Sequence, residues 1–195
     1  MPDLLDTPVR DLLEDLRSEA LAPGSGAAAA LTAALAASVV EMCARATPGE
    51  TLRGAAAQAG ALRRRVGPLA ELDTLAYAES LAALHLPERL ESEVRNMAIR
   101  DTLARAAAVP LAIAEASSDV ALLAAEVAER CEPALRADAV AAAQLAEGAA
   151  RASAELVAVN LGVLEEDERL ELARTLATSA ATAARRVGVF GGSRP

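Results

Sequence analysis

Apolar positions along this chain recur at the three- and four-residue spacing of amphipathic helices, and proline or glycine stands at nearly every break. The first stretch opens at Pro8, carries an apolar stripe of Leu12, Leu13 and Leu16, and ends before Pro23. The pattern predicts eight helices, which we place at about residues 8–22, 26–46, 51–66, 69–84, 88–108, 111–130, 133–161 and 165–187.

The composition supports an all-α fold. Of the 195 residues 53% are hydrophobic and 52 are alanine, the best intrinsic helix former, whereas only Tyr77 and Phe190 are aromatic. This length fits one domain better than two, so we assign residues 1–190 to a single helical domain and expect 191–195 to be a disordered tail.

Small side chains determine how such helices pack. Alanine faces let helix axes approach to the short end of the usual ~8–10 Å range, although each buried methyl group contributes only about 0.8 kcal/mol. We therefore predict an up-and-down bundle of long helices that forms a homodimer through alanine-rich faces, including the helix at 26–46. Because Pro110 disfavours a helical conformation at Val109, we expect a break or kink there.

The net charge and the lengths of the apolar stretches indicate which classes of partner the protein has. There are 28 acidic residues against 19 arginines and no lysine, which gives a net charge of -9 and disfavours nucleic acid as a partner. The longest basic run, residues 63–65, is too short to change this. Residues 1–10 do not resemble a signal peptide, and the apolar stretch 27–40 is shorter than the ~20 residues of a membrane span. We expect a cytoplasmic protein with no membrane partner.

Metal-binding patterns are missing from the sequence. Cys43 and Cys131 lack the paired spacing of zinc ligands or of a disulfide framework, so we expect two free thiols in a reducing compartment. The single histidine, His85, has no ligand partners nearby in sequence and stands where a helix ends. We predict no metal site.

The most unusual local feature is the loop Pro23-Gly24-Ser25-Gly26-Ala27. Its glycines permit close approach of the backbone to a ligand, and the helix that follows offers unpaired N–H groups and the positive end of its dipole. A carboxylate, a phosphate or a polar ring edge suits that position. A plain turn between two helices explains the same residues.

Three side chains are candidates for chemistry. Asp73 and Tyr77 stand one helical turn apart, so a carboxyl group and a phenol share one face and are able to orient a heterocycle or move a proton. An exposed aspartate beside a core tyrosine has the same spacing. Asp138 lies within an alanine-rich helix, where a carboxylate either faces solvent or has a raised pKa and a function.

Taken in order, these segments resemble the cyclodeaminase/cyclohydrolase family of folate enzymes over nearly the whole chain. The residues that carry the resemblance are Leu21-Ala22-Pro23-Gly24-Ser25-Gly26 with the alanines that follow, Asp73-Thr74-Leu75-Ala76-Tyr77, Leu86-Pro87, Val109-Pro110-Leu111-Ala112-Ile113-Ala114-Glu115, Asp138-Ala139 and Val159-Asn160-Leu161.

The resemblance implies an all-helical homodimer with no permanently bound cofactor and a tetrahydrofolate derivative as substrate. Cyclodeamination requires a general acid and cyclohydrolysis a general base, and either role suits Asp138 or Asp73. The loop residues Pro23, Gly24, Ser25 and Gly26 would hold the pteridine ring or the glutamate tail. Tyr77 would pack against a ring, Asn160 would contact substrate, and the arginines at 63–65 are candidates for binding additional glutamates.

Several positions differ from the family pattern. Ser25 stands in place of a glycine and Ala27 in place of a serine, and Ala134, Ala137 and Leu156 stand where family members carry polar side chains. A non-catalytic relative that keeps the bundle as a folate-binding or assembly module is therefore the alternative. In an unbroken helix Asp138 and Asn160 are separated by about 33 Å, too far for one small pocket within one protomer.

Overall fold

The computed structural model describes residues 4–18, 22–84, 92–162 and 167–188, and within these ranges it contains helices and no strand. The elements are α1 (Val9–Leu16), α2 (Ser25–Ala46), α3 (Arg53–Val66), α4 (Leu69–Leu84), α5 (Ser92–Ala106), α6 (Ala108–Arg130), the short 3₁₀ helix η1 (Pro133–Leu135), α7 (Arg136–Leu161) and α8 (Glu168–Val187). The predicted all-α class is confirmed.

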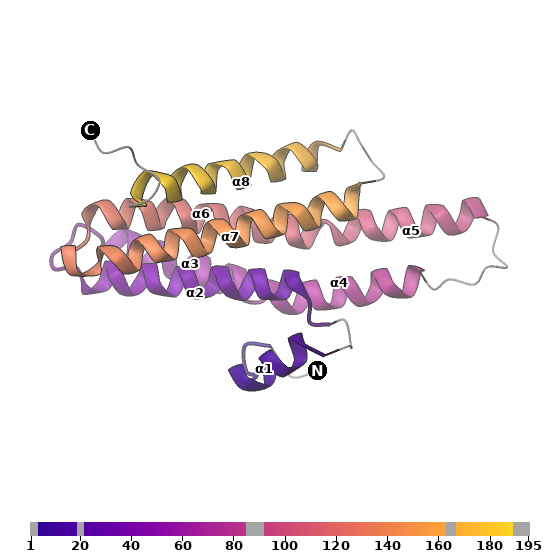
Figure 1. The fold of residues 1–195 in the computed structure, drawn as a ribbon, viewed down its shortest axis with the longest axis horizontal. Coiled ribbons are helices and arrows are strands. Elements are labelled where there is room, and N and C mark those ends of the chain that lie inside the picture. Colours follow the sequence, from indigo (N-terminus) through magenta and orange to yellow (C-terminus); the bar gives the residue numbers. More distant parts are fainter. Residues whose placement is uncertain (1–3, 19–21, 85–91, 163–166, 189–195) are drawn as a thin grey trace.

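Three long helices, α2, α6 and α7, form the body of an up-and-down bundle (Figure 1). Helix α3 packs on α2 and α6, and α8 packs on α6 and α7. Helices α4 and α5 lie side by side and extend beyond the body at one end (Figure 1). Helix α1 lies beneath α2 in the same view, and its Leu12 packs against the core alanines of α2. The first turns of α2 and α4 therefore meet near the middle of the molecule.

Alanine fills the centre of the bundle. On α2, Ala30, Ala33 and Ala37 are fully buried, and so are Ala142 and Ala146 on α7. Ala37, Ala142 and Ala146 belong to a core cluster that also includes residues of α3, α6 and α8. Ala30 and Ala33 belong to a second cluster with residues of α3, α4, α6 and α7. Other helices of the same protomer cover these alanines of α2, because small side chains let the helices approach closely. The homodimer through alanine-rich faces stays a prediction.

Proline positions explain where the helix boundaries depart from the sequence prediction. The break expected at Pro110 lies three residues earlier, where α5 ends at Ala106 and α6 begins at Ala108. Pro110 then falls in the first turn of α6, where a missing N–H costs little. Helix α1 ends at Leu16, earlier than expected. The expectations for residues 85–91 and for the tail lie outside the described residues.

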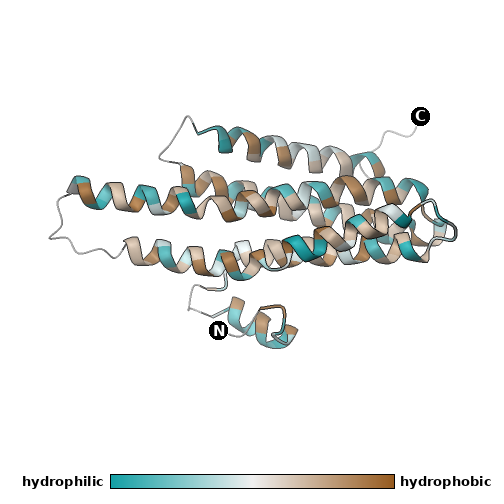
Figure 2. Ribbon diagram, turned by 180° about the vertical axis from the view of Figure 1, so that it is seen from behind, coloured by the Kyte–Doolittle hydropathy of each residue, from teal (hydrophilic) through white to brown (hydrophobic). Residues whose placement is uncertain are grey.

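Hydropathy alone does not distinguish a core helix from a membrane span here. Two helical stretches, Ser25–Ala46 and Glu93–Arg130, are long and apolar enough to cross a bilayer, and more than half of each apolar window is buried inside the bundle. In Figure 2 apolar residues alternate with hydrophilic ones along the helices. The burial of these windows, and not their composition, is what the structure adds.

An ion pair fixes the start of α8 beside the junction of α5 and α6. The Asp167 carboxylate accepts the backbone N–H of Arg169 at 3.0 Å and the guanidinium at 2.7 and 2.9 Å. These hydrogen bonds lower the pKa of Asp167 to about 2. The same guanidinium donates to the Ala104 carbonyl at 2.6 Å, which ties α8 to the last turn of α5.

Candidate functional site

A cleft of about 320 Å³ opens where four helix segments meet: the first turn of α2, the middle of α4, the end of α5 and the last turns of α7. Its volume is near the lower end of the range of about 300–1,000 Å³ for small-molecule sites. The lining residues are Gly24, Ser25, Gly26, Asp73, Ala76, Tyr77, Ser80, Ala106, Leu156, Val159 and Asn160.

Helical spacing places the polar side chains of α4 on the cleft. Asp73, Tyr77 and Ser80 follow one another at intervals of four and three residues, so they share a helix face. The Ser80 hydroxyl donates to the Ala76 carbonyl at 2.9 Å, which leaves its oxygen lone pairs as acceptors. Tyr77 is 39% exposed, so its ring is partly open to solvent.

The Asp73 carboxyl group lies against the start of α2. It accepts a hydrogen bond from the backbone N–H of Ala27 and lies beside Gly26. Burial raises the pKa of Asp73 above its ordinary value of 3.8, and the Ala27 N–H partly offsets this rise. Asp73 is the one ionisable carboxyl group among the lining residues of the described chain.

Most of the residues predicted for the site come together in this cleft. Gly24, Ser25, Gly26, Asp73, Tyr77 and Asn160 all line it. Pro23, the first residue of the loop, is buried and does not line the cleft. The lining residues that were not predicted for the site are Ala76, Ser80, Ala106, Leu156 and Val159. Only Ser80 had a usable signal, because it falls on the same face of α4 as Asp73 and Tyr77.

Asp138 does not belong to this cleft. It is exposed in the first turn of α7, whereas Asn160 is in the last turn, and α7 is continuous between them. Asp138 lies instead near Cys43, a free and buried thiol whose pKa is raised to about 11 by burial and by the neighbouring Cys131 and Asp138. The separation expected for an unbroken helix is what the structure shows, so one protomer does not bring both side chains to one pocket.

The basic run at the end of α3 pairs with acids on other helices. Arg63 lies 3.6 Å from Glu41, and Arg65 lies 2.9 Å from Glu115. None of the three arginines lines the cleft. In the part of the chain that the structure describes, no cluster of three or more His, Cys, Asp or Glu side chains has the geometry to hold a metal ion.

The raised pKa of Asp73 predicts a pH-dependent stability difference. Between pH 3.8 and the raised pKa the unfolded chain has lost the Asp73 proton and the folded protein has not, so wild-type stability falls as pH rises through this window. Asp73→Asn removes the titration. Its free energy of unfolding relative to wild type is expected to increase over this window and then level off. Urea unfolding at a series of pH values measures this, and a constant difference would contradict it.

In the described residues, the fold is a helical bundle whose cleft is lined by one carboxyl group, that of Asp73. The sequence profile of the formiminotransferase-cyclodeaminase family matches residues 8–179. The chain is 32% identical over 127 residues to formimidoyltransferase-cyclodeaminase of Mus musculus, covering 60% of this chain and 24% of the mouse protein. The Sus scrofa protein of the same name is 32% identical over 122 residues, covering 57% and 23%. The alignments thus span about a quarter of these relatives' length.

The crystal structure of formiminotetrahydrofolate cyclodeaminase from Thermotoga maritima has the same fold, with a TM-score of 0.80 over 94% of this chain and 96% of that one, at 19% identity. The chain belongs to the formiminotransferase-cyclodeaminase family.

Proposed function

We propose that this protein is a folate one-carbon enzyme that converts formiminotetrahydrofolate to methenyltetrahydrofolate with release of ammonia. The observation that carries the proposal is the Asp73 carboxyl group, which lies in the cleft with a pKa raised by burial. A carboxylic acid with a raised pKa stays protonated up to a pH nearer neutrality. It is therefore more often in the form that donates a proton to a leaving amine.

The reaction needs a proton at one atom. The neighbouring folate nitrogen attacks the carbon of the protonated formimino group, so a new C–N bond forms, the C=N bond becomes a single bond to an amino group, and the attacking nitrogen loses its proton. The amino group on the same carbon then takes a proton from the Asp73 carboxyl and leaves as ammonia, with cleavage of the second C–N bond. The proton released by the attacking nitrogen restores Asp73, directly or through water.

The other lining groups suit a heterocycle. The Asn160 amide donates and accepts hydrogen bonds, and the Tyr77 ring offers an aromatic face at the open side of the cleft. The walls formed by Ala76, Ala106 and Leu156 are apolar. A cleft of about 320 Å³ accommodates a fused ring system and leaves the rest of a folate outside.

Two assays test this function. Incubation with formiminotetrahydrofolate should produce the methenyl chromophore and ammonia in equal amounts. Loss of a methenyl chromophore supplied as substrate, with no ammonia formed from the formimino compound, would instead support the cyclohydrolase reaction. A thermal shift with folates but no turnover would support the non-catalytic module, and no response to any folate would contradict all three.

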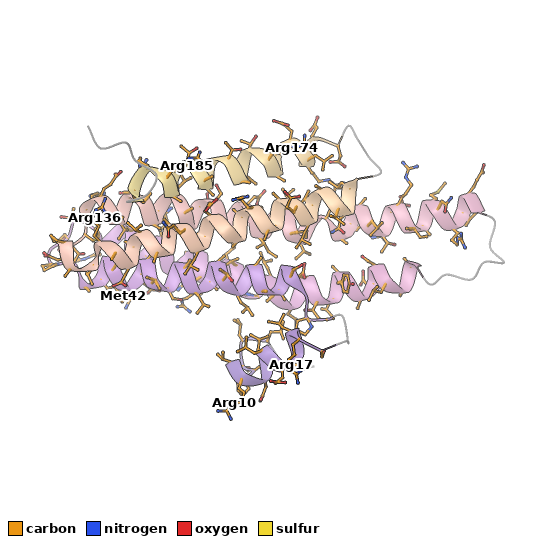
Figure 3. The ribbon with its side chains drawn as sticks, in the orientation of Figure 1. Arg10, Arg17, Met42, Arg136, Arg174 and Arg185 are labelled. Carbon is orange, nitrogen blue, oxygen red and sulfur yellow. The ribbon has the colours of Figure 1, made fainter. Side chains whose placement is uncertain are left out.

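We also propose that the protein is a homodimer, with the apolar groove between α1 and α2 covered by the α1 of a second copy. The groove has a volume of about 620 Å³ and is lined by leucines of both helices. Leu13 and Leu35 in it are 59% and 65% exposed, and apolar patches of this kind are uncommon on monomers. Arg10 and Arg17 project from α1 away from the bundle (Figure 3), so the polar side of α1 faces solvent.

Replacing Leu35 with glutamate is expected to shift the dimer toward monomer, because it places a charge in the apolar contact. We expect the dissociation constant of the dimer to rise at least roughly tenfold, a change of about 1.4 kcal/mol in the free energy of dimerisation. Sedimentation velocity at micromolar concentration measures it. Leu145→Glu is the matched control, since Leu145 is 46% exposed on α7 and does not line the groove. A wild-type protein that sediments as a monomer would refute the dimer.

A further inference from the structure

We infer that Gly26 is a positioning residue: its missing side chain lets the start of α2 hold the carboxyl group of Asp73, so this helix terminus orients the protein's own acid and does not bind an anionic group of the ligand. The inference deepens the proposed function and rests on it for its catalytic consequence. Its structural part stands on the geometry of α2 and α4 alone.

The space at Gly26 is occupied by Asp73. A Cβ atom built on Gly26 would lie closer than 3.0 Å to both carboxyl oxygens and to the carboxyl carbon of Asp73, a separation that real Cβ atoms essentially never show. Gly54 and Gly148, also within helices, have nothing within 4 Å of such an atom. Any side chain at position 26 therefore displaces the Asp73 carboxyl group, whereas the other two positions tolerate one.

The Asp73 carboxyl group takes the place of a ligand at the start of α2. The Ala27 N–H donates to Asp73, and the positive end of the α2 dipole further favours its charged form, while burial disfavours that form. Because the Asp73 carboxyl group already accepts the Ala27 N–H, this N–H is not open to an anionic group of the ligand. Among the described residues, no arginine lines the cleft to attract such an anionic group.

This occupancy decides which end of a folate enters. The pteridine ring carries N–H donors that pair with the oxygens of the Asp73 carboxyl group and of the Asn160 amide, whereas the carboxylates of the glutamate tail find the Ala27 N–H already used. The ring therefore enters the cleft beside Asp73, and the tail points out of it. Of the two assignments open from sequence for the loop at 23–27, the structure favours the ring.

A double-mutant cycle on thermal stability tests the contact without any substrate. Gly26→Ala is expected to lower Tm by roughly 3–10 °C in the wild-type background and to have no such effect in an Asp73→Ala background, where the overlapping atoms are gone. Gly148→Ala, in open space on α7, is the matched control and should raise Tm slightly in both backgrounds. Equal losses from Gly26→Ala in both backgrounds would overturn the contact.

The positioning role has its own readout. In the wild type the NMR chemical shift of the Ala27 amide proton should change with pH as the Asp73 carboxyl group ionises. In Gly26→Ala this pH dependence should disappear although the chain stays folded. With formiminotetrahydrofolate as substrate, Gly26→Ala should lower kcat at least about tenfold with KM changed less than threefold. An unchanged Ala27 titration or an unchanged kcat would overturn the positioning role. Absence of turnover in the wild type would refute only the proposed function, because the stability cycle and the amide titration need no substrate.

Discussion

Replacing Asp73 with asparagine is expected to lower kcat for ammonia release about 10²–10⁴-fold, the usual contribution of a positioned general acid. The amide keeps the shape of the carboxyl group and accepts the Ala27 N–H, but it has no proton to give the leaving amine. Because only the proton transfer is lost, KM should change little. Stopped-flow absorbance of the methenyl product measures both constants.

The matched control for this prediction is Glu79→Gln, which makes the same chemical change on the same helix. Glu79 is exposed and does not line the cleft, so full kcat is expected. If Asp73→Asn turned over at the wild-type rate, the assignment of the acid would be wrong even though the fold and the family would stand. Equal losses in the two variants would indicate a general effect of charge on α4.

Much of the fold follows from local sequence. Alanine-rich stretches between proline and glycine determine the helices, and the predicted limits of 26–46 and 69–84 differ by at most one residue from those of α2 and α4. The α5–α6 boundary was harder, because proline is tolerated in the first turn of a helix and so does not mark the break itself. Which alanine faces meet depends on contacts between distant segments, and the sequence pattern does not contain them.

The site could be predicted only in part for the same reason. Spacing on one helix identified Asp73 and Tyr77, and the family resemblance added Asn160, all of which line the cleft. Composition did not predict that a carboxyl group of the protein occupies the start of α2. This group belongs to Asp73, which stands 47 positions after Gly26 on another helix. Asp138 was an equally good candidate by composition, and only the course of α7 separates it from the cleft.

Close packing of alanine is what positions the cleft, because α2 and α7 bring their ends to it only while their axes stay near each other. Ala142 is fully buried where α7 enters this core. Ala142→Leu adds volume at a contact with no room, and we expect it to lower the free energy of unfolding by about 1–3 kcal/mol or more.

The adjacent position supplies the control for this change. Ala141 is exposed on the same helix, so Ala141→Leu makes an identical substitution with the same helix propensity, and we expect an effect within about 0.5 kcal/mol. Chemical denaturation of the two variants compares them directly. Because the inserted side chain also pushes α7 away from α2, folate binding should weaken in Ala142→Leu and stay unchanged in Ala141→Leu. Equal stability of the two variants would mean that the core accommodates a leucine at position 142 without loss of stability. The close approach of the helices would then not determine the geometry of the site.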